Sequence, residues 1–515
     1  MVHDWTSHHV IFTGAPEHEK REVVLNDPRF WNHFYFRGWR PNWPFRPQWP
    51  VFLQSKRDWS YSLNNGSGGT IGAPAKFVFD VTATPSCTKD FIVTGVNVAG
   101  STTQANIIGL TNLYVDSSGK GYCSGTAPTL MFAYNIGTGL VNSYISLSLA
   151  GDKVAFNENG TTPYFHVLTF STGTGNGTSA AAPAVPGTGN SAVDTKLALT
   201  GGVSTAPYVD YAKDTAYVTT TDNVMHKFSG VFRGTPAEVT TGGWPISTGI
   251  STSYGISTPV YDGVTKHVFF TDSSNGSIDY VDDSGSTATV VTGTFDFGSA
   301  GFTPAPVVVD STNQKVYAFA ANPNGTHAVV AQADTSLSSS SQVVVNVGNG
   351  NTAGYNPLEG DFNNAYYSGT AASALLYVVG NDSTANRIPS LFGIGFNSSF
   401  KMNATASSGP IKLATATAGA SPVTEFYNST TSKDYIFVGV TTRCTTAITG
   451  GCIRSIDITS GFPTATSVNN VVLAASGGTG GITVDNNSSY SEASSVYYAP
   501  LSGNTVVKAT QSALQ

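Results

Sequence analysis

Charged residues are scarce in this chain of 515 residues: Asp, Glu, Lys and Arg together make up 11% of the positions. The formal net charge is −7, whereas a nucleic-acid-binding surface needs clustered Lys and Arg. The chain also lacks the apolar run of about 18 or more residues that a membrane-spanning helix requires. The sequence therefore predicts neither a nucleic-acid partner nor a membrane span.

Familiar catalytic and metal-binding motifs are missing as well. There is no G-x-S-x-G elbow, no H-E-x-x-H motif and no P-loop. The acidic segment 271–286 and Asp116 do not fit the spaced D-x-D-x-D-G pattern of a calcium loop, and Asx-type turns explain these carboxylates. The acids of that segment are Asp272, Asp279, Asp282 and Asp283. We predict no cofactor, with calcium at these acids as the alternative.

What the chain does contain is a repeated β pattern. It is rich in Gly, Ser, Thr, Asn, Val and Tyr, which favours short strands joined by tight turns. In each repeat, a small residue or Pro enters a short apolar strand, a polar turn follows, and a strand with a central aromatic comes next. The copies start at Pro74, Ser143, Ala206, Thr258, Ala305, Pro357, Ser421 and Gly480, roughly 47 to 69 residues apart.

This spacing fits one four-stranded antiparallel blade of a β-propeller per copy. We therefore predict an all-β, eight-bladed propeller over residues 58–515. The alternative is seven blades, with residues 74–136 forming something else. The last copy is one strand short, and "RDWSYSLNNGS" (57–67) has the alternation of a strand. We expect residues 58–63 to complete the C-terminal blade and so remove two exposed sheet edges.

The four cysteines fit this arrangement of strands. Cys87 and Cys123 fall in loops that share one face of the first blade, and Cys444 and Cys452 flank a hairpin turn. We predict the disulfides Cys87–Cys123 and Cys444–Cys452, with four free thiols as the alternative. No pair has CxxC spacing, which argues against zinc. Disulfides and the scarcity of Lys and Glu favour an extracellular, periplasmic or cell-surface location, although residues 1–12 lack the features of a signal peptide.

Residues 1–57 form a separate arm rich in aromatic residues and Pro. Six of the seven tryptophans lie in the first 59 residues, and "NDPRFWNHFYF" (26–36) predicts one short helix with Asn26 as its N-cap. We expect the arm to pack on the propeller, to reach a neighbouring subunit, or to stack on sugars. His8 and His9 are adjacent and would point to opposite faces of a strand, which argues against a shared metal ion. The candidate interface residues are Trp31, Trp39, Trp43 and Trp49.

Acidic residues recur at similar places in the inner strands of six repeats. They are Asp210, Asp262, Asp310, Asp361, Glu425 and Asp485. Two explanations stay open: a turn-forming Asp that the repeat carries along, or a ring of carboxylates at one end of the central channel, with Asp210, Asp262, Asp310 and Asp485 as its core.

Two strands carry a resemblance to a known repeat. "TAYVTTTDN" (215–223) and "KVYAFAANPNG" (315–325) resemble the YVTN-type propeller repeats of secreted and surface-layer proteins of bacteria and archaea. The segment Asp4–His9 is similar to a D-W-T-x-H-H start found in secreted bacterial propeller proteins. The resemblance implies the fold over about residues 59–515 and brings no activity. The docking-Trp motif and adjacent-cysteine disulfide of quinoprotein dehydrogenases are absent, as are WD and kelch signatures.

A propeller fold does not by itself determine a function. The leading hypothesis is a non-catalytic extracellular or surface protein that binds a carbohydrate or surface ligand, or that self-assembles through its arm into a homo-oligomer. The alternative is a secreted polysaccharide-acting enzyme, a lyase or glycosidase, with its site at the central channel.

Overall fold

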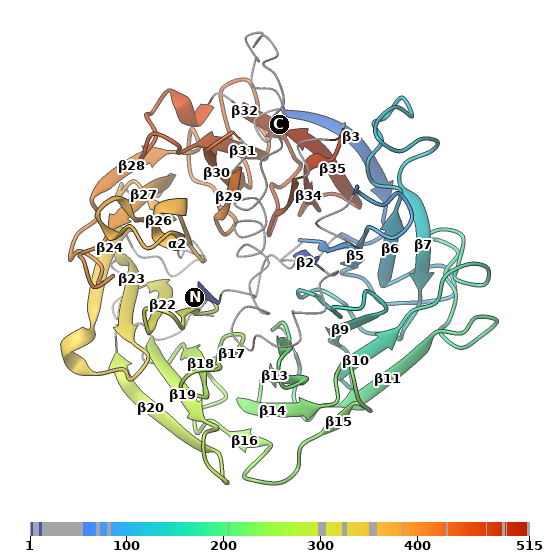
Figure 1. Cartoon of the computed structure of the whole chain (residues 1–515), viewed down its shortest axis with the longest axis horizontal. Coiled ribbons are helices and arrows are strands. Elements are labelled where there is room, and N and C mark those ends of the chain that lie inside the picture. The colour runs from blue at the N-terminus through green and yellow to red at the C-terminus, as the bar shows by residue number, and fades with distance from the viewer. Residues whose placement is uncertain are drawn as a thin grey trace.

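Eight antiparallel sheets surround a central axis in the computed structural model (Figure 1). The structure describes residues 2–3, 10–12, 55–67, 73–79, 84–203, 205–274, 276–296, 305–321, 327–349, 358–384, 386–428, 431–469, 471–486, 490 and 492–511. Each predicted repeat forms one sheet, so the eight-bladed propeller is confirmed. The seven-bladed alternative is wrong, because residues 75–134 supply a complete blade.

Every blade starts at the axis and proceeds outward. The innermost strands are β4 (Ala75–Val78), β8 (Ser146–Leu147), β12 (Tyr208–Asp210), β17 (Val260–Asp262), β21 (Val308–Asp310), β25 (Asp361–Phe362), β29 (Thr424–Asn428) and β33 (Thr483–Asn486). The second strands are β5 (Phe91–Gly95), β9 (Lys153–Glu158), β13 (Thr215–Thr219), β18 (His267–Asp272), β22 (Lys315–Ala321), β26 (Leu375–Asn381), β30 (Lys433–Val440) and β34 (Ser494–Tyr498).

The outer half of each blade follows the same order. The third strands are β6 (Ile107–Thr111), β10 (Tyr164–Thr169), β14 (Val224–Ser229), β19 (Ser277–Asp282), β23 (His327–Asp334), β27 (Pro389–Gly395), β31 (Cys452–Asp457) and β35 (Thr505–Gln511). The fourth strands are β7 (Thr129–Tyr134), β11 (Val193–Ala198), β15 (Ala237–Glu238), β20 (Thr289–Asp296), β24 (Val343–Asn349), β28 (Ser408–Lys412), β32 (Val471–Ala474) and β3 (Ser55–Ser62).

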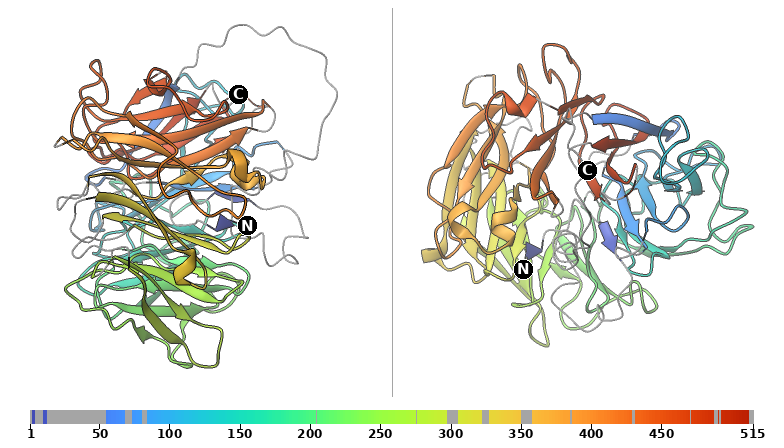
Figure 2. Two further views of the ribbon diagram at one scale, coloured as in Figure 1. Left: turned by 90° about the vertical axis from the view of Figure 1, so that its left-hand side faces the viewer. Right: turned by 45° about the horizontal axis from the view of Figure 1, so that its top comes forward.

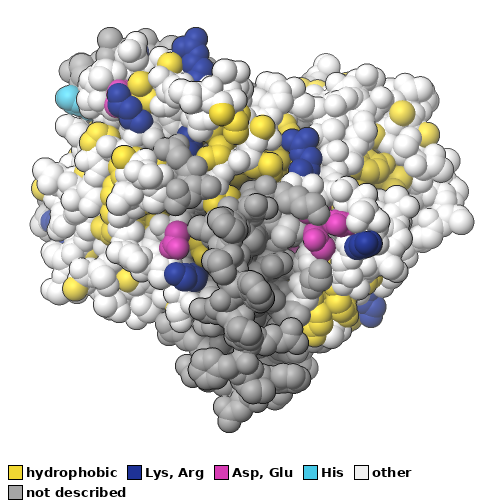
Figure 3. All heavy atoms as spheres, turned by 90° about the horizontal axis from the view of Figure 1, so that it is seen from above, with side chains coloured by type: hydrophobic (Ala, Val, Ile, Leu, Met, Phe, Trp, Pro, Cys, Tyr) yellow, Lys and Arg dark blue, Asp and Glu magenta, His cyan; other side chains and the backbone are white. Residues whose placement is uncertain are grey.

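Burial falls from the axis to the rim, because each blade packs face to face on its neighbours. All residues of β13 and β34 are buried, whereas β11 alternates between exposed and half-buried positions. Aromatic rings fill the space between blades: Tyr217 of blade 3 stacks on Tyr261 of blade 4 with ring centroids 5.5 Å apart. On the rim, charged side chains lie scattered among neutral ones (Figure 3), in keeping with the low charge content.

The C-terminal blade is completed by the N-terminal strand, as predicted. β3 pairs antiparallel with β35, with Trp59 opposite Lys508 and Tyr61 opposite Val506, and it lies along the outer side of that blade (Figures 1 and 2). Trp59 and Leu63 are buried there. The strand begins at Ser55 rather than at residue 58, and a β-bulge interrupts its register between Arg57 and Trp59.

Two short N-terminal strands extend the inner edges of two blades. β1 (Val2–His3) pairs antiparallel with β21, and β2 (Val10–Phe12) pairs parallel with β4. The predicted helix at 26–36, the histidines His8 and His9, and the candidate interface residues Trp31, Trp39, Trp43 and Trp49 lie outside the described residues.

Two blades depart from the regular pattern. In blade 3 the fourth strand is split: Gly242 and Gly243 adopt φ values of 63° and 86° between β15 and β16 (Ile246–Ser247), which pairs separately with β14. In blade 6 the inner hairpin contains α2 (Asn364–Tyr367), capped by the side chain of Asn363, and a 3-10 turn at Ala371–Ser373. Further 3-10 turns lie at Ser339–Ser341 and Ser467–Asn469. No helix in the described part of the chain is long and apolar enough to cross a membrane.

Both predicted disulfides are present. Cys87 and Cys123 join two loops of blade 1, with their Cα atoms 5.7 Å apart, and Cys444 and Cys452 join the ends of a hairpin loop in blade 7, with Cα atoms 5.9 Å apart. The alternative of free thiols is therefore wrong.

Candidate functional site

Three of the recurring acids, Asp210, Asp262 and Asp310, each end an inner strand and build the same turn. Asp361 begins its strand, and Glu425 and Asp485 lie within theirs. The carboxylate of Asp310 accepts hydrogen bonds from the backbone N–H groups of residues 312 and 313, both at 2.9 Å. Asp210 and Asp262 accept from the N–H groups two and three positions later in the same way. The residue four positions after each Asp has positive φ: Asp214, Lys266 and Gln314. The repeated Asp therefore closes the turn into the second strand.

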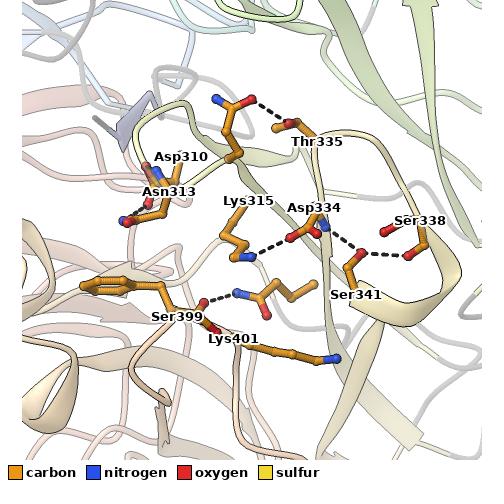
Figure 4. Close-up of polar contacts among 12 residues, drawn as sticks. Asp310, Asn313, Lys315, Asp334, Thr335, Ser338, Ser341, Ser399 and Lys401 are labelled. Carbon is orange, nitrogen blue, oxygen red and sulfur yellow. Dashed lines mark hydrogen bonds and ion pairs between the residues drawn. The ribbon is translucent and has the colours of Figure 1, made fainter.

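The same acids also link successive blades. Ser311 of blade 5 donates its hydroxyl to Asp262 of blade 4, and Tyr366 of blade 6 donates its hydroxyl to Asp310 at 2.6 Å. The backbone N–H of Glu425 donates to Asp361 at 2.8 Å. Figure 4 shows Asp310 beside Asn313 at the turn of blade 5. The acids thus tie the blades together.

All six acids are buried, including Asp485, which lies where blade 8 packs against blade 1. Burial raises the pKa of Asp210 and that of Asp485. These carboxylates are therefore withdrawn from solvent and engaged by protein donors, and a ring of Asp210, Asp262, Asp310 and Asp485 that binds a ligand stays a prediction.

The acidic side chains of segment 271–286 in blade 4 lie in separate places. Asp272 and Asp279 come together in the blade, where the Ser277 hydroxyl lies within hydrogen-bond distance of both carboxyl groups; burial and the neighbouring Asp272 raise the pKa of Asp279 to about 8. Asp283 instead accepts from Tyr217, Lys227 and Trp244 of blade 3.

The remaining acidic candidates serve local turns. Asp282 accepts from the N–H of Ser284, and Asp116 accepts from the N–H groups of Ser118 and Lys120. Within the described ranges, no group of three or more His, Cys, Asp or Glu residues is placed to hold a metal ion. Calcium at these acids stays a prediction.

Blade 1 carries a braced surface that we call the blade 1 loop face: Phe79, residues 84–90 and residues 112–128, with Tyr490 from blade 8. Its anchor is Asp90, a fully buried carboxylate that accepts from the N–H of Phe79 at 2.8 Å, the N–H of Ser86 at 3.0 Å and the hydroxyl of Tyr114 at 2.7 Å. The disulfide Cys87–Cys123 then ties the two loops together. This part of the surface is therefore held in one conformation.

Two aromatic side chains stand out from this braced surface. Phe79 is 42% exposed, and the ammonium group of Lys89 lies 3.8 Å from its ring centroid. Tyr122, adjacent to the disulfide, is 37% exposed and meets the ring of Tyr490 edge-on at 4.8 Å. Rings held by a cation–π contact and by an aromatic neighbour offer rigid apolar faces to a ligand.

A buried polar cluster joins blade 8 to blade 1 beneath this face. Lys76 is fully buried on β4, and its ammonium group contacts Asp485 of β33 at 3.1 Å. Lys508 of β35, also fully buried, contacts Asp58 of β3 at 3.0 Å and Glu492 at 3.3 Å. Of these residues the sequence patterns singled out only Asp485; Lys76, Lys508, Asp58 and Glu492 were not predicted. The signal that could have found them is a lysine inside an otherwise apolar strand, in "PAKFVF" and in "NTVVKAT".

Comparison with solved structures places the architecture among known folds. The chain is similar to Sqt1 from Chaetomium thermophilum: one structure aligns with a TM-score of 0.53 at 13% identity, covering 89% of this chain and 98% of that chain. A second Sqt1 structure gives 0.50 at 14% identity, with 82% and 93% covered. BamB from Moraxella catarrhalis aligns with a TM-score of 0.44 at 13% identity, covering 89% and 99%. At such identities the likeness to Sqt1 shows the fold alone.

No protein-family model matches the chain, and no curated protein sequence matches it. The resemblance to YVTN-type repeats and to the D-W-T-x-H-H start therefore stays a prediction.

Proposed function

We propose that this chain is a non-catalytic β-propeller that works outside the cytoplasm and binds a carbohydrate through its blade 1 loop face. The observation that carries the proposal is the pair of exposed aromatic rings, Phe79 and Tyr122, on loops fixed by Asp90 and a disulfide. Sugar rings present flat C–H faces that pack on aromatic faces. A surface that is already ordered loses little conformational entropy when it binds.

The buried acids support binding rather than catalysis. Glycoside hydrolysis needs two carboxyl groups that face the substrate, about 5 to 10 Å apart. The inner-strand acids nearest the channel, such as Asp262 and Asp310, are buried and accept hydrogen bonds from their own turns and from the next blade. The alternative of a lyase or glycosidase at the channel therefore has less support than binding at the loop face.

The location outside the cytoplasm is supported by the cysteines. Both cysteine pairs are bonded, and among the described residues none is left as a free thiol. Structural disulfides persist in oxidising compartments and are rare in the cytosol.

A glycan array probed with the fluorescently labelled chain tests the proposal. We expect binding to at least one class of polysaccharide, and the double variant Phe79→Ser with Tyr122→Ser should bind it at least tenfold more weakly, because truncating an aromatic anchor costs about 2 kcal/mol or more. Val264→Ser is the matched control: Val264 is 57% exposed on the corresponding inner turn of blade 4 and should leave affinity unchanged. No binding, or equal binding by the double variant, would contradict the proposal.

Self-assembly through residues 1–57 is a separate proposal that rests on the sequence. Mass measurement in solution, with and without those residues, tests it. A monomer in both cases removes the assembly idea.

A further inference from the structure

The closing strand of the ring brings a buried lysine against a buried carboxyl group. Lys508 of β35 and Asp58 of β3 have side chains with no exposed surface, and Lys508 Nζ lies 3.0 Å from Asp58 Oδ2. Glu492 Oε2 lies 3.3 Å from the same nitrogen. An amine and a carboxyl group are thus held together out of solvent beside a second, half-buried carboxylate, at the point where strands from the two ends of the chain meet.

The backbone explains why Asp58 reaches Lys508. The register passes from Arg57 opposite Ala509 to Trp59 opposite Lys508, so Asp58 and Trp59 together oppose one residue of β35. A bulge of this kind changes the direction of the extra side chain and is a built feature of a strand rather than a defect. Trp59, which is itself buried, packs near Tyr497 with ring centroids 6.0 Å apart.

The second carboxylate is also held in place by the backbone. Glu492 adopts a φ of 62°, in the left-handed region that non-glycine residues rarely occupy. A Cβ placed at Gly121 of the blade 1 loop face would meet the Tyr114 carbonyl oxygen and lie 3.1 Å from Glu492 Cγ, so a glycine is needed where this loop passes Glu492.

The polar contacts indicate a shared proton. The hydroxyl of Thr510 lies 2.6 Å from Asp58 Oδ2 and 2.7 Å from Glu492 Oε2, yet a hydroxyl has one hydrogen to donate. One of the two carboxyl groups must therefore carry a proton or share one. Burial raises the pKa of Asp58 to about 6, and among the described residues its buried Oδ1 has no hydrogen-bond partner. Asp58 is thus the carboxyl group that takes the proton.

Lys76, the other buried lysine of this seam, shows the contrast. Its nitrogen contacts Asp485 Oδ2, the Tyr114 hydroxyl and the Phe77 carbonyl, each at 3.1 Å. Those three acceptors match the three hydrogens of an ammonium group. Within the described part of the chain, the nitrogen of Lys508 contacts only the carboxyl groups of Asp58 and Glu492. One hydrogen of an ammonium group at this position would therefore have no acceptor.

We propose that Lys508 Nζ and Asp58 Cγ form an amide bond, which closes the propeller ring covalently. A proton first passes from the Lys508 ammonium group to the Asp58 carboxylate across their 3.0 Å contact, which gives an amine and a carboxylic acid. The nitrogen lone pair then attacks Cγ and forms the C–N bond. The C–OH bond breaks and water leaves.

Glu492 is the catalytic residue of this step. It accepts a proton from the attacking nitrogen and returns it to the departing hydroxyl group. Ammonium plus carboxylate thus become amide plus water, with no change of oxidation state and no co-reactant. The fixed geometry supplies the high effective concentration that amide formation needs, and the complete burial of Lys508 and Asp58 keeps bulk water from the product.

Intact-mass measurement of the full chain, purified and unfolded with its disulfides reduced, tests the proposal. We expect a mass lower than that of the sequence by one water molecule, and protease digestion should release a branched peptide that contains both Asp58 and Lys508. A chain with the full sequence mass, whose digest gives the two peptides separately, overturns the proposal.

Variants assign the roles. Lys508→Met and Glu492→Gln should each keep the full sequence mass, whereas Lys76→Met should still lose one water. Asp58→Asn should lose ammonia instead of water and converge on the same final mass as the parent, because both reactions give the same amide. Circular dichroism establishes that each variant is folded. A Glu492→Gln chain that becomes linked as completely as the parent overturns the role of Glu492, and a water loss that survives in Lys508→Met places the bond elsewhere and overturns the assignment.

Discussion

The seam between blades 8 and 1 and the junction between blades 4 and 5 join the same kinds of strands with different side chains. At the interior junction, Ser311 donates its hydroxyl to Asp262, Thr271 donates to the carbonyl of residue 305, and apolar side chains pack around these contacts. At the seam, the Lys76–Asp485 ion pair is buried, and within blade 8 Lys508 meets Asp58 of the strand supplied by the N-terminal part of the chain.

The difference follows from how the chain builds each blade. Blades 4 and 5 are consecutive in the chain, whereas blade 8 is assembled from both ends of it. Closing a loop that long costs conformational entropy. The Lys76–Asp485 pair adds specificity where β4 packs against β33, two strands that lie far apart in the chain.

The largest effect should come from breaking the ion pair at the seam. Asp485→Ala leaves the Lys76 ammonium buried without its carboxylate, which should lower the free energy of unfolding by about 3 to 5 kcal/mol. Ser311→Ala at the interior junction should cost about 1.5 kcal/mol, because Asp262 keeps its turn donors. Urea unfolding measures both.

The double variant Lys76→Met with Asp485→Leu is the control for this experiment. It should recover most of the loss, since an apolar pair removes the uncompensated charge. Equal losses in Asp485→Ala and Ser311→Ala would remove the distinction between the seam and the interior junction.

The two disulfides offer a second contrast between the seam and a regular blade. Cys87–Cys123 in blade 1 spans 36 residues, and Cys444–Cys452 in blade 7 spans 8. If the bonds act by restricting the unfolded chain, replacing the first pair by Ala should cost about 4 kcal/mol and replacing the second about 2.5 kcal/mol. Thermal unfolding of the two double variants checks the order, and a larger loss for the blade 7 pair would refute the entropic account.

The repeat, the closing strand and both cysteine pairs could be read from the sequence because each depends on local pattern. An alternation such as Trp59–Tyr61–Leu63 marks a strand, and a missing strand in the last repeat calls for one from the opposite end. The recurring Asp was also visible, as in Asp262 and Asp310, but its two explanations could not be separated, because the pattern does not say whether a carboxylate faces its own turn or the channel.

The contacts of the seam could not be read in the same way. Lys508 meets Asp58 and Glu492 only after the ring has closed, and no spacing in the sequence reports that meeting. The split outer strand of blade 3 was missed for a different reason, since Gly242 and Gly243 interrupt a run that otherwise has strand composition.

A pH experiment compares the acids of the seam with Asp279, a buried acid of blade 4 that has no lysine partner among the described residues. The pKa of Asp279 is raised from 3.8 to about 8 by burial and by Asp272. Between these values the folded chain holds a proton that the unfolded chain has lost, so stability should fall as pH rises from about 4 to about 8. Asp279→Asn removes this dependence, and its stability should change less across that range.

Asp282→Asn is the matched control for the pH experiment. Hydrogen bonds from Ser284 lower the pKa of Asp282 below 3.8, so its contribution is lost only as pH falls below about 4, and its variant should keep the parent's slope from pH 5 to 8. Denaturant unfolding at several pH values measures the slopes. Identical slopes for the parent and Asp279→Asn would contradict the assignment.

The smallest effect on stability should come from the aromatic rings at the surface of the seam. Tyr122→Ser removes a ring that is 37% exposed and touches Tyr490, so the free energy of unfolding should change by about 0.5 kcal/mol or less. Tyr114→Phe, directly below, removes a hydroxyl that donates to Asp90 and accepts from Lys76, and it should cost about 1 to 3 kcal/mol. Unfolding curves that place Tyr122→Ser at or above Tyr114→Phe would show that Tyr122 supports the fold rather than a ligand, and would separate the surface of the seam from its core.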